Sequence, residues 1–218
     1  MTTARRFSHG ELTLALHELR GGSGATLLLL HQLGGASTDW GAPPEGWPGP
    51  VFALDFAGHG ASERRTGGSY VPELLAADAD AALELLGPCR LAGAGVGAYV
   101  ALLLAGARPE RVPGALLLPG RGLDGGGPLP DPRRGRTFIA APTDRDGDPN
   151  PNPDPMIWSC DADPRPPDYA LAFAGAARRL LLAEDGGPRP PWWEAIRAAS
   201  AARRLALDVT SPFAALLE

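Results

Sequence analysis

Apolar residues occur along this chain in two patterns, short continuous runs and longer stretches with helical spacing. A short continuous apolar run is typical of a strand that is buried on both faces of a sheet. In 10–17, polar and apolar residues partly alternate through Leu12, Leu14 and Leu16, which indicates a half-exposed strand. The runs that predict buried strands lie at 25–30, 51–54, 90–92, 115–118, 180–183 and 205–207.

Helical spacing fills most of the intervals between these runs. It is found at 71–86, 98–107 and 192–202, and in a weaker form at 169–178. Buried strands that alternate with helices imply parallel crossover connections. The pattern therefore predicts an α/β fold with a doubly wound, mostly parallel sheet.

The stretch at about 120–168 differs from the rest, because Asp, Pro, Gly and Asn crowd together there without a period. A long structureless stretch between two strands of one sheet is typical of a lid or a binding loop. We expect it to be largely irregular, to cover the C-terminal ends of the strands, and to be anchored by a few apolar residues, Ile139, Met156, Ile157 and Trp158. The length of 218 residues favours one domain over 1–218, with this insertion inside it.

Composition narrows the possible partners and cofactors. The formal net charge is -5, which gives nucleic acid no electrostatic reason to bind. Cys89 and Cys160 form neither a ligand cluster nor a CxxC pair, so no metal site, cofactor or disulfide framework is expected and a reducing cytoplasm fits best. The N-terminus has no apolar signal segment, and no run approaches 18 apolar residues, so a membrane partner is not expected.

The segment after the first buried strand reads His31-Gln32-Leu33-Gly34-Gly35, with a tryptophan downstream. It is similar to the HGxGG segment of the α/β-hydrolase superfamily, which the chain resembles over nearly its whole length. In that family the backbone N–H just after the HG pair supplies half of the oxyanion hole, which implies Leu33 here. Gln32 replaces the usual glycine, so its side chain either narrows the pocket or places an amide in it.

A second segment, from Asp55 to Ser62, is similar to the DxxGHGxS loop of the same family. A histidine in a turn bounded by glycines more often satisfies backbone groups than abstracts protons. We therefore expect His59, and His31 likewise, to be structural.

The family's nucleophile elbow, G-x-S-x-G, corresponds to Gly93-Ala94-Gly95-Val96-Gly97. Gly95 stands at the nucleophile position, so the attacking hydroxyl is absent. Glycine tolerates the strained backbone of that turn, so we expect the shape of the elbow to persist. The N–H groups of Leu33 and Val96 are then expected to converge near Gly95 and to form a small anion or carbonyl site. Without the family, the segment is a glycine-rich turn that could cradle a phosphate, but the third glycine of a dinucleotide fingerprint is missing.

The other members of the triad are also degraded. In the family the acid and then the histidine follow the elbow, yet His9, His17, His31 and His59 all precede it. The acid position falls on Gly186, with Asp185 one residue early, and the histidine position falls near Ser211.

The resemblance thus implies a hydrolase fold without its triad. The leading hypothesis is a noncatalytic protein that binds a small metabolite or a protein partner, with Trp158 among the residues that line the pocket. One alternative is an enzyme that uses other chemistry in the same pocket, such as a lyase-like or cyclising step, or residual hydrolysis, on a small metabolite. That alternative requires Asp185, Asp124 or His31 to reach the elbow. Another is an obligate partner of an active paralogue.

Overall fold

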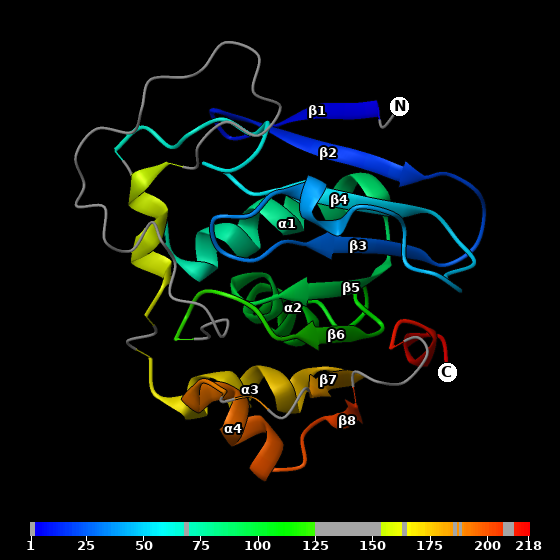
Figure 1. The fold of residues 1–218 in the computed structure, drawn as a ribbon, viewed down its shortest axis with the longest axis vertical. Coiled ribbons are helices and arrows are strands. Elements are labelled where there is room, and N and C mark those ends of the chain that lie inside the picture. The colour runs from blue at the N-terminus through cyan, green and yellow to red at the C-terminus, as the bar shows by residue number, and fades with distance from the viewer. Residues whose placement is uncertain are drawn as a thin grey trace.

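The computed structural model describes residues 3–67, 70–124, 154–162, 165–184, 187, 189–206 and 212–218. Within them, eight strands form one sheet in the order β1-β2-β4-β3-β5-β6-β7-β8 (Figure 1). The strands are β1 (Thr3–His9), β2 (Leu12–Arg20), β3 (Thr26–Leu30), β4 (Val51–Asp55), β5 (Cys89–Ala94), β6 (Ala115–Leu118), β7 (Leu180–Glu184) and β8 (Arg203–Ala206).

Four α-helices and three 3-10 helices lie between or after the strands of the described chain. Three of the α-helices start at a proline, whose fixed φ and missing N–H suit the first turn. The α-helices are α1 (Pro72–Leu86), α2 (Val96–Ala107), α3 (Pro167–Ala176) and α4 (Pro191–Ala198), and the 3-10 helices are η1 (Ser37–Trp40), η2 (Pro155–Cys160) and η3 (Ala214–Leu216). The prediction of an α/β fold with a mostly parallel sheet is confirmed.

The antiparallel edge of the sheet was not part of the prediction. Strand β1 pairs antiparallel with β2, from Thr3 opposite Glu18 to His9 opposite Leu12, and β2 pairs antiparallel with β4. The remaining pairs, from β4 through β8, are parallel. Most of β1 is exposed, so it lacks the apolar run that reveals the inner strands, and its pairing with β2 defines it.

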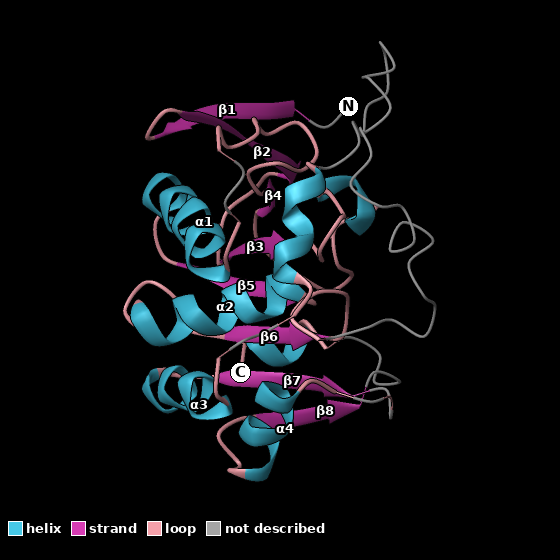
Figure 2. Cartoon of the chain, turned by 90° about the vertical axis from the view of Figure 1, so that its left-hand side faces the viewer, coloured by secondary structure: helices cyan, strands magenta, loops and turns pink. Residues whose placement is uncertain are grey.

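Alternate residues of the inner strands point to opposite faces of the sheet, and the two faces bury different sets of side chains. Leu28 and Leu30 of β3 belong to the larger cluster, which includes residues from all four α-helices. Figure 2 shows α1, α2 and α3 together on that face. Leu27 and Leu29 belong to the second cluster, which packs against Trp47 and against η3. Because both faces are covered, the inner strands are continuously apolar.

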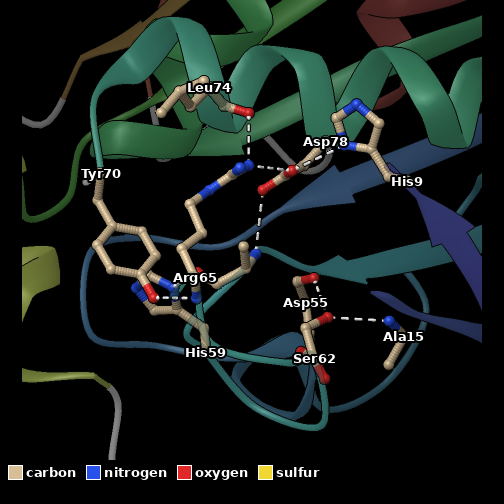
Figure 3. A network of polar contacts seen from close by, with 10 residues as sticks. His9, Ala15, Asp55, His59, Ser62, Arg65, Tyr70, Leu74 and Asp78 are labelled. Carbon is tan, nitrogen blue, oxygen red and sulfur yellow. Dashed lines mark hydrogen bonds and ion pairs between the residues drawn. The ribbon is translucent and has the colours of Figure 1, made fainter. Parts of the chain in front are cut away.

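Helix α1 is joined to the start of the sheet through a buried carboxylate (Figure 3). The Asp78 side chain has no exposed surface; its Oδ1 lies 2.5 Å from Nη2 of Arg65 and 3.1 Å from Nδ1 of His9. Its Oδ2 accepts the N–H of Ala57 at 3.1 Å. Burial raises the pKa of Asp78, while Arg65, the Ala57 N–H and His9 act to lower it. The carboxylate thereby ties α1 to β1 and to the loop after β4.

The insertion predicted at about 120–168 lies largely outside the described residues, which include 120–124, 154–162 and 165–168 of it. The helix η2 forms within it, with Ile157 buried and Met156 46% exposed, and α3 begins before its end. Ile139 lies outside the described residues, so the irregular lid stays a prediction. None of the helices described is long and apolar enough to cross a membrane.

Candidate functional site

The elbow follows strand β5 directly. Gly95 has φ 55 and ψ -121, and α2 begins at the next residue. The flanking glycines allow backbone segments to lie close together: a Cβ at Gly93 would lie 2.6 Å from the nitrogen of Ala98, and a Cβ at Gly97 would lie 2.6 Å from the carbonyl oxygen of His31. This is a sharp strand-to-helix turn of the kind that presents a nucleophile. Here it presents no side chain.

The two N–H groups expected to form an oxyanion hole point at one atom. The N–H of Leu33 donates to the carbonyl oxygen of Arg121 at 3.1 Å, and the N–H of Val96 donates to the same oxygen at 2.9 Å. A backbone carbonyl from elsewhere in the chain thus sits where a substrate carbonyl or anion would be bound. The expected open anion or carbonyl site is therefore absent from this structure, because both donors are used.

The segment that supplies this oxygen, residues 120–123, is called the plug here. It follows β6, and close backbone approaches fit it to the elbow. A Cβ at Gly120 would lie 2.6 Å from the nitrogen of Gly95, and a Cβ at Gly122 would lie 2.9 Å from the Cβ atoms of Leu33 and Val96. Glycines at 120 and 122 are what allow the chain to pass so close to the elbow.

Two side chains and one backbone carbonyl hold the plug in place. Oε1 of Gln32 accepts the N–H of Arg121 at 3.1 Å. Leu123 is fully buried; its N–H donates to the carbonyl oxygen of Cys160 at 2.7 Å, and its own carbonyl lies 3.4 Å from Nε1 of Trp192. The amide that replaces the family glycine at residue 32 therefore bonds to the plug. The plug is part of the packed core.

The plug and a side chain at residue 95 exclude each other. A Cβ built on Gly95 would lie 2.6 Å from the nitrogen and 2.7 Å from the carbonyl carbon of Arg121, and closer still to its oxygen. Real Cβ atoms essentially never lie below 3.0 Å from such atoms. A serine at this position would have to displace the plug before its hydroxyl could reach a substrate.

His31 and His59 both bind backbone groups. Nδ1 of His31 lies 2.8 Å from the carbonyl oxygen of Gln32, and its Nε2 accepts the N–H of Phe56 at 3.2 Å. Nδ1 of His59 lies 3.0 Å from the carbonyl oxygen of Ala57, and its Nε2 accepts the N–H of Gly34 at 3.3 Å. Both ring nitrogens of each histidine bond to backbone groups, so each ring is neutral and has a structural role, as the sequence led us to expect.

Burial keeps these two rings neutral. It lowers the pKa of His59 to about 3, with further lowering by His31, because a charged ring would lose its hydration. It also lowers the pKa of His31. A group that is uncharged throughout the neutral range and bonded at both nitrogens does not serve as a general base.

The DxxGHGxS loop is held by its first carboxylate. Oδ1 of Asp55 accepts the N–H of Ser37 at 2.6 Å, and its Oδ2 accepts the N–H of Ala61 at 2.9 Å and lies 2.8 Å from Nε2 of His17. Burial raises the pKa of Asp55, but the bond from His17, the interaction with His31 when that ring is protonated at low pH, and the two backbone bonds outweigh it and bring the pKa to about 2. Ser62 donates to the carbonyl oxygen of Asp55 and accepts the N–H of Ala15 (Figure 3). This loop is structural.

Three of the remaining candidate residues, Asp185, Gly186 and Ser211, lie outside the described residues, so their part in the site stays a prediction. Asp124 is exposed, and its N–H donates to the carbonyl oxygen of Asp161. The ring of Trp158 covers Gly34, where a Cβ would lie 2.7 Å from its Cη2.

The sequence pattern placed Ala94 and Val96 among the expected site residues, but it did not single out Arg121. The only local signal was the pair of glycines on either side of Arg121, directly after the strand that neighbours the elbow strand in the sheet. The backbone carbonyl that fills the hole carries no signature in its residue type. Its role depends on where the chain passes after β6.

Comparison with solved structures agrees with the topology of the sheet. A hypothetical protein from Pseudomonas aeruginosa PAO1 superposes with a TM-score of 0.71 at 21% sequence identity, covering 94% of this chain and 90% of that one. A thioesterase domain from the curacin biosynthetic pathway gives a TM-score of 0.70 at 17% identity, covering 95% and 92%. No family model matches the sequence, and no curated protein matches it. The likeness is therefore one of fold.

Proposed function

We propose that this chain, which has the α/β-hydrolase fold, is a noncatalytic member of that fold: its own backbone closes the reaction site, and the protein acts by binding. The observation that carries this proposal is the carbonyl oxygen of Arg121, bonded to the N–H groups of Leu33 and Val96. In a serine hydrolase these donors must be free to stabilise the oxyanion of the transition state. Here they stabilise the folded chain instead.

The residue types at the elbow support the same conclusion. Gly95 offers no nucleophile, and the four histidines of the chain precede the elbow in sequence. His31, the histidine named as a possible base for other chemistry, has both ring nitrogens bonded to backbone groups. A lyase-like or cyclising reaction at this position would need a titratable group beside Gly95 and space for a substrate. The plug takes that space.

A filled elbow also bears on what the protein binds. A small metabolite at the elbow would have to replace the Arg121 carbonyl and the packing of Leu123. A ligand or protein partner held elsewhere on the molecule needs no such change. We therefore place the binding role outside the elbow. Cys89 and Cys160 are buried and form no disulfide, which accords with the cytoplasmic location proposed from the sequence.

The test is ester hydrolysis and labelling by a fluorophosphonate, a reagent that reacts with activated serines. Wild type, Gly95→Ser and Gly95→Ser/Ser211→His are assayed with short acyl p-nitrophenyl esters. We expect no labelling and no turnover above the blank in wild type and in Gly95→Ser, since neither has a base and the hole is occupied. When a triad member is removed from a serine hydrolase, the oxyanion hole and substrate binding still accelerate the reaction by about 10³ to 10⁴-fold over water. A filled oxyanion hole cannot provide this residual acceleration. Turnover by wild type at rates ordinary for hydrolases would disprove the proposal.

A further inference from the structure

A polar pocket apart from the elbow is lined by residues from the C-terminal end of β7 and from helix α4. Figure 1 shows α4 near β8, at one end of the sheet. Its volume is about 240 Å³, and its lining residues are Glu184, Gly187, Arg189, Glu194 and Arg197. One water molecule takes up about 30 Å³ in the liquid, so this pocket has room for a small solute. The C-terminal ends of parallel strands are where open α/β sheets bind their ligands.

The unsatisfied carboxylate of Glu184, the last residue of β7, indicates that a ligand binds in this pocket. Its Oε1 is buried and has no hydrogen-bond partner in the described structure. A buried carboxylate oxygen without a donor destabilises the folded state, so an oxygen of this kind indicates that a donor binds there. The missing group is an N–H or O–H donor.

The charges around Glu184 are arranged in a way that favours one class of ligand. Across the pocket on α4, Nε of Arg197 lies 2.8 Å from Oε2 of Glu194, and Nη2 of Arg197 lies 2.5 Å from the same oxygen. These two nitrogens are engaged, whereas the outer nitrogen of this guanidinium, Nη1, is not part of that ion pair. This nitrogen is a donor that a ligand carboxylate can bind. Gly187, which has no side chain, also lines the pocket.

We propose that this pocket binds a small zwitterion of the amino-acid class, with its ammonium group on Glu184 and its carboxylate on Arg197. The pocket, the orphaned carboxylate oxygen and the guanidinium of Arg197 in the pocket lining carry this inference. It does not depend on whether the elbow is catalytic. A zwitterion satisfies Glu184 and adds no net charge to a pocket in which two acidic and two basic side chains already balance.

The test compares three probes that differ by one charged group: L-alanine, ethylamine, which lacks the carboxylate, and propionate, which lacks the ammonium. Binding to the full chain is followed by ¹H–¹⁵N NMR shifts of the indole of Trp193 and the amides of α4, with concentrations up to about 20 mM, because a site with two charged contacts on a small ligand gives a Kd of about 1 mM. We expect L-alanine to bind at least tenfold more tightly than either fragment, because each charged hydrogen bond contributes about 1.5 to 3 kcal/mol.

Three variants assign the contacts. Glu184→Gln and Arg197→Gln should each weaken L-alanine binding by at least tenfold, with an unchanged fold. Glu110→Gln removes an exposed carboxylate that pairs with Arg178 outside the pocket, and it should leave binding unchanged. Absence of binding to wild type at 20 mM would overturn the proposal, as would binding that is insensitive to Glu184→Gln. A crystal structure with only an ordered water on Oε1 of Glu184 in the presence of the probe would also overturn it.

Discussion

Gly95 shows how much one missing side chain decides at the elbow. Its φ of 55 suits glycine, and the carbonyl of Arg121 takes the space of its Cβ. The space beside Gly95 is thus filled by a group that bonds the N–H groups of Leu33 and Val96. The absence of a side chain at residue 95 and the position of the plug are linked, because a side chain there and the plug cannot occupy the same volume.

Two glycine substitutions distinguish the loss of stability caused by contact with the plug from the loss caused by backbone strain alone. Gly95→Ser should lower the free energy of unfolding by roughly 2 to 4 kcal/mol, since it adds overpacking against Arg121 to the strain of a left-handed backbone. Gly41 has nearly the same backbone, with φ 60 and ψ -103, and no atom within 4 Å of its missing Cβ. Gly41→Ser should therefore lower it by only about 1 to 2 kcal/mol. Urea denaturation of both variants is the measurement, and equal losses would mean that the plug yields without resistance.

At the scale of elements, the buried carboxylate of Asp78 joins α1 to β1 and to the loop after β4. Its partners come from two parts of the chain that are far apart in sequence: His9 of β1, and Ala57 and Arg65 of the loop after β4. The next acidic residue of α1, Asp80, pairs with Arg108 of the α2 end, but that pair lies near the surface, with Arg108 52% exposed. The two carboxylates allow a buried and an exposed ion pair to be compared on one helix.

We expect Asp78→Asn to lower the free energy of unfolding by roughly 2 to 4 kcal/mol, because it leaves the largely buried guanidinium of Arg65 without its counter-charge. Asp80→Asn should lower it by less than about 1 kcal/mol, since solvent screens the exposed pair. Chemical denaturation monitored by circular dichroism gives both values. If the two substitutions have the same effect, Asp78 does not hold α1 against the sheet edge.

At the scale of the whole molecule, the buried neutral histidines make stability depend on pH. The pKa of His59 is about 3 in the folded chain, against the model-peptide value of about 6.5 expected in the unfolded chain, so the unfolded state binds more protons between these values. Its contribution is therefore fully present above pH 6.5 and is lost as the pH falls toward 3. His31 acts in the same direction. Asp55, with a pKa of about 2, adds stability that is present above the ordinary Asp pKa of about 4 and is lost as the pH falls from there toward 2.

Moving from pH 7.5 to pH 5 should lower the free energy of unfolding by about 2 kcal/mol through His59 alone. Urea midpoints of wild type and His59→Gln at both pH values measure this. Glutamine does not titrate, so the variant should lose about 2 kcal/mol less than wild type over the same interval, whatever its stability at pH 7.5. Parallel pH profiles for the two proteins would show that His59 is charged in the folded state.

Much of the fold could be predicted from the sequence, because a strand that is buried on both faces of a sheet consists almost entirely of apolar residues. The runs at 25–30, 51–54, 115–118 and 180–183 each fall on an inner strand, within one residue at either end. Strand β1 could not be found in this way, since its exposed residues carry no apolar pattern and only pairing with β2 defines it. The 3-10 helix η2 is likewise too short to have a period of its own.

The sequence by itself determined what the elbow lacks: Gly95 has no hydroxyl, and no histidine follows it, facts that belong to residue types and their order. Only the tertiary structure decided what fills the elbow. The oxygen that accepts the N–H groups of the oxyanion hole belongs to the backbone of Arg121. Every residue carries such an oxygen, so the residue type at 121 gives no sign of this role. Which carbonyl meets the N–H groups of Leu33 and Val96 depends on the path of the chain after β6. That path is fixed by close packing between segments far apart in sequence.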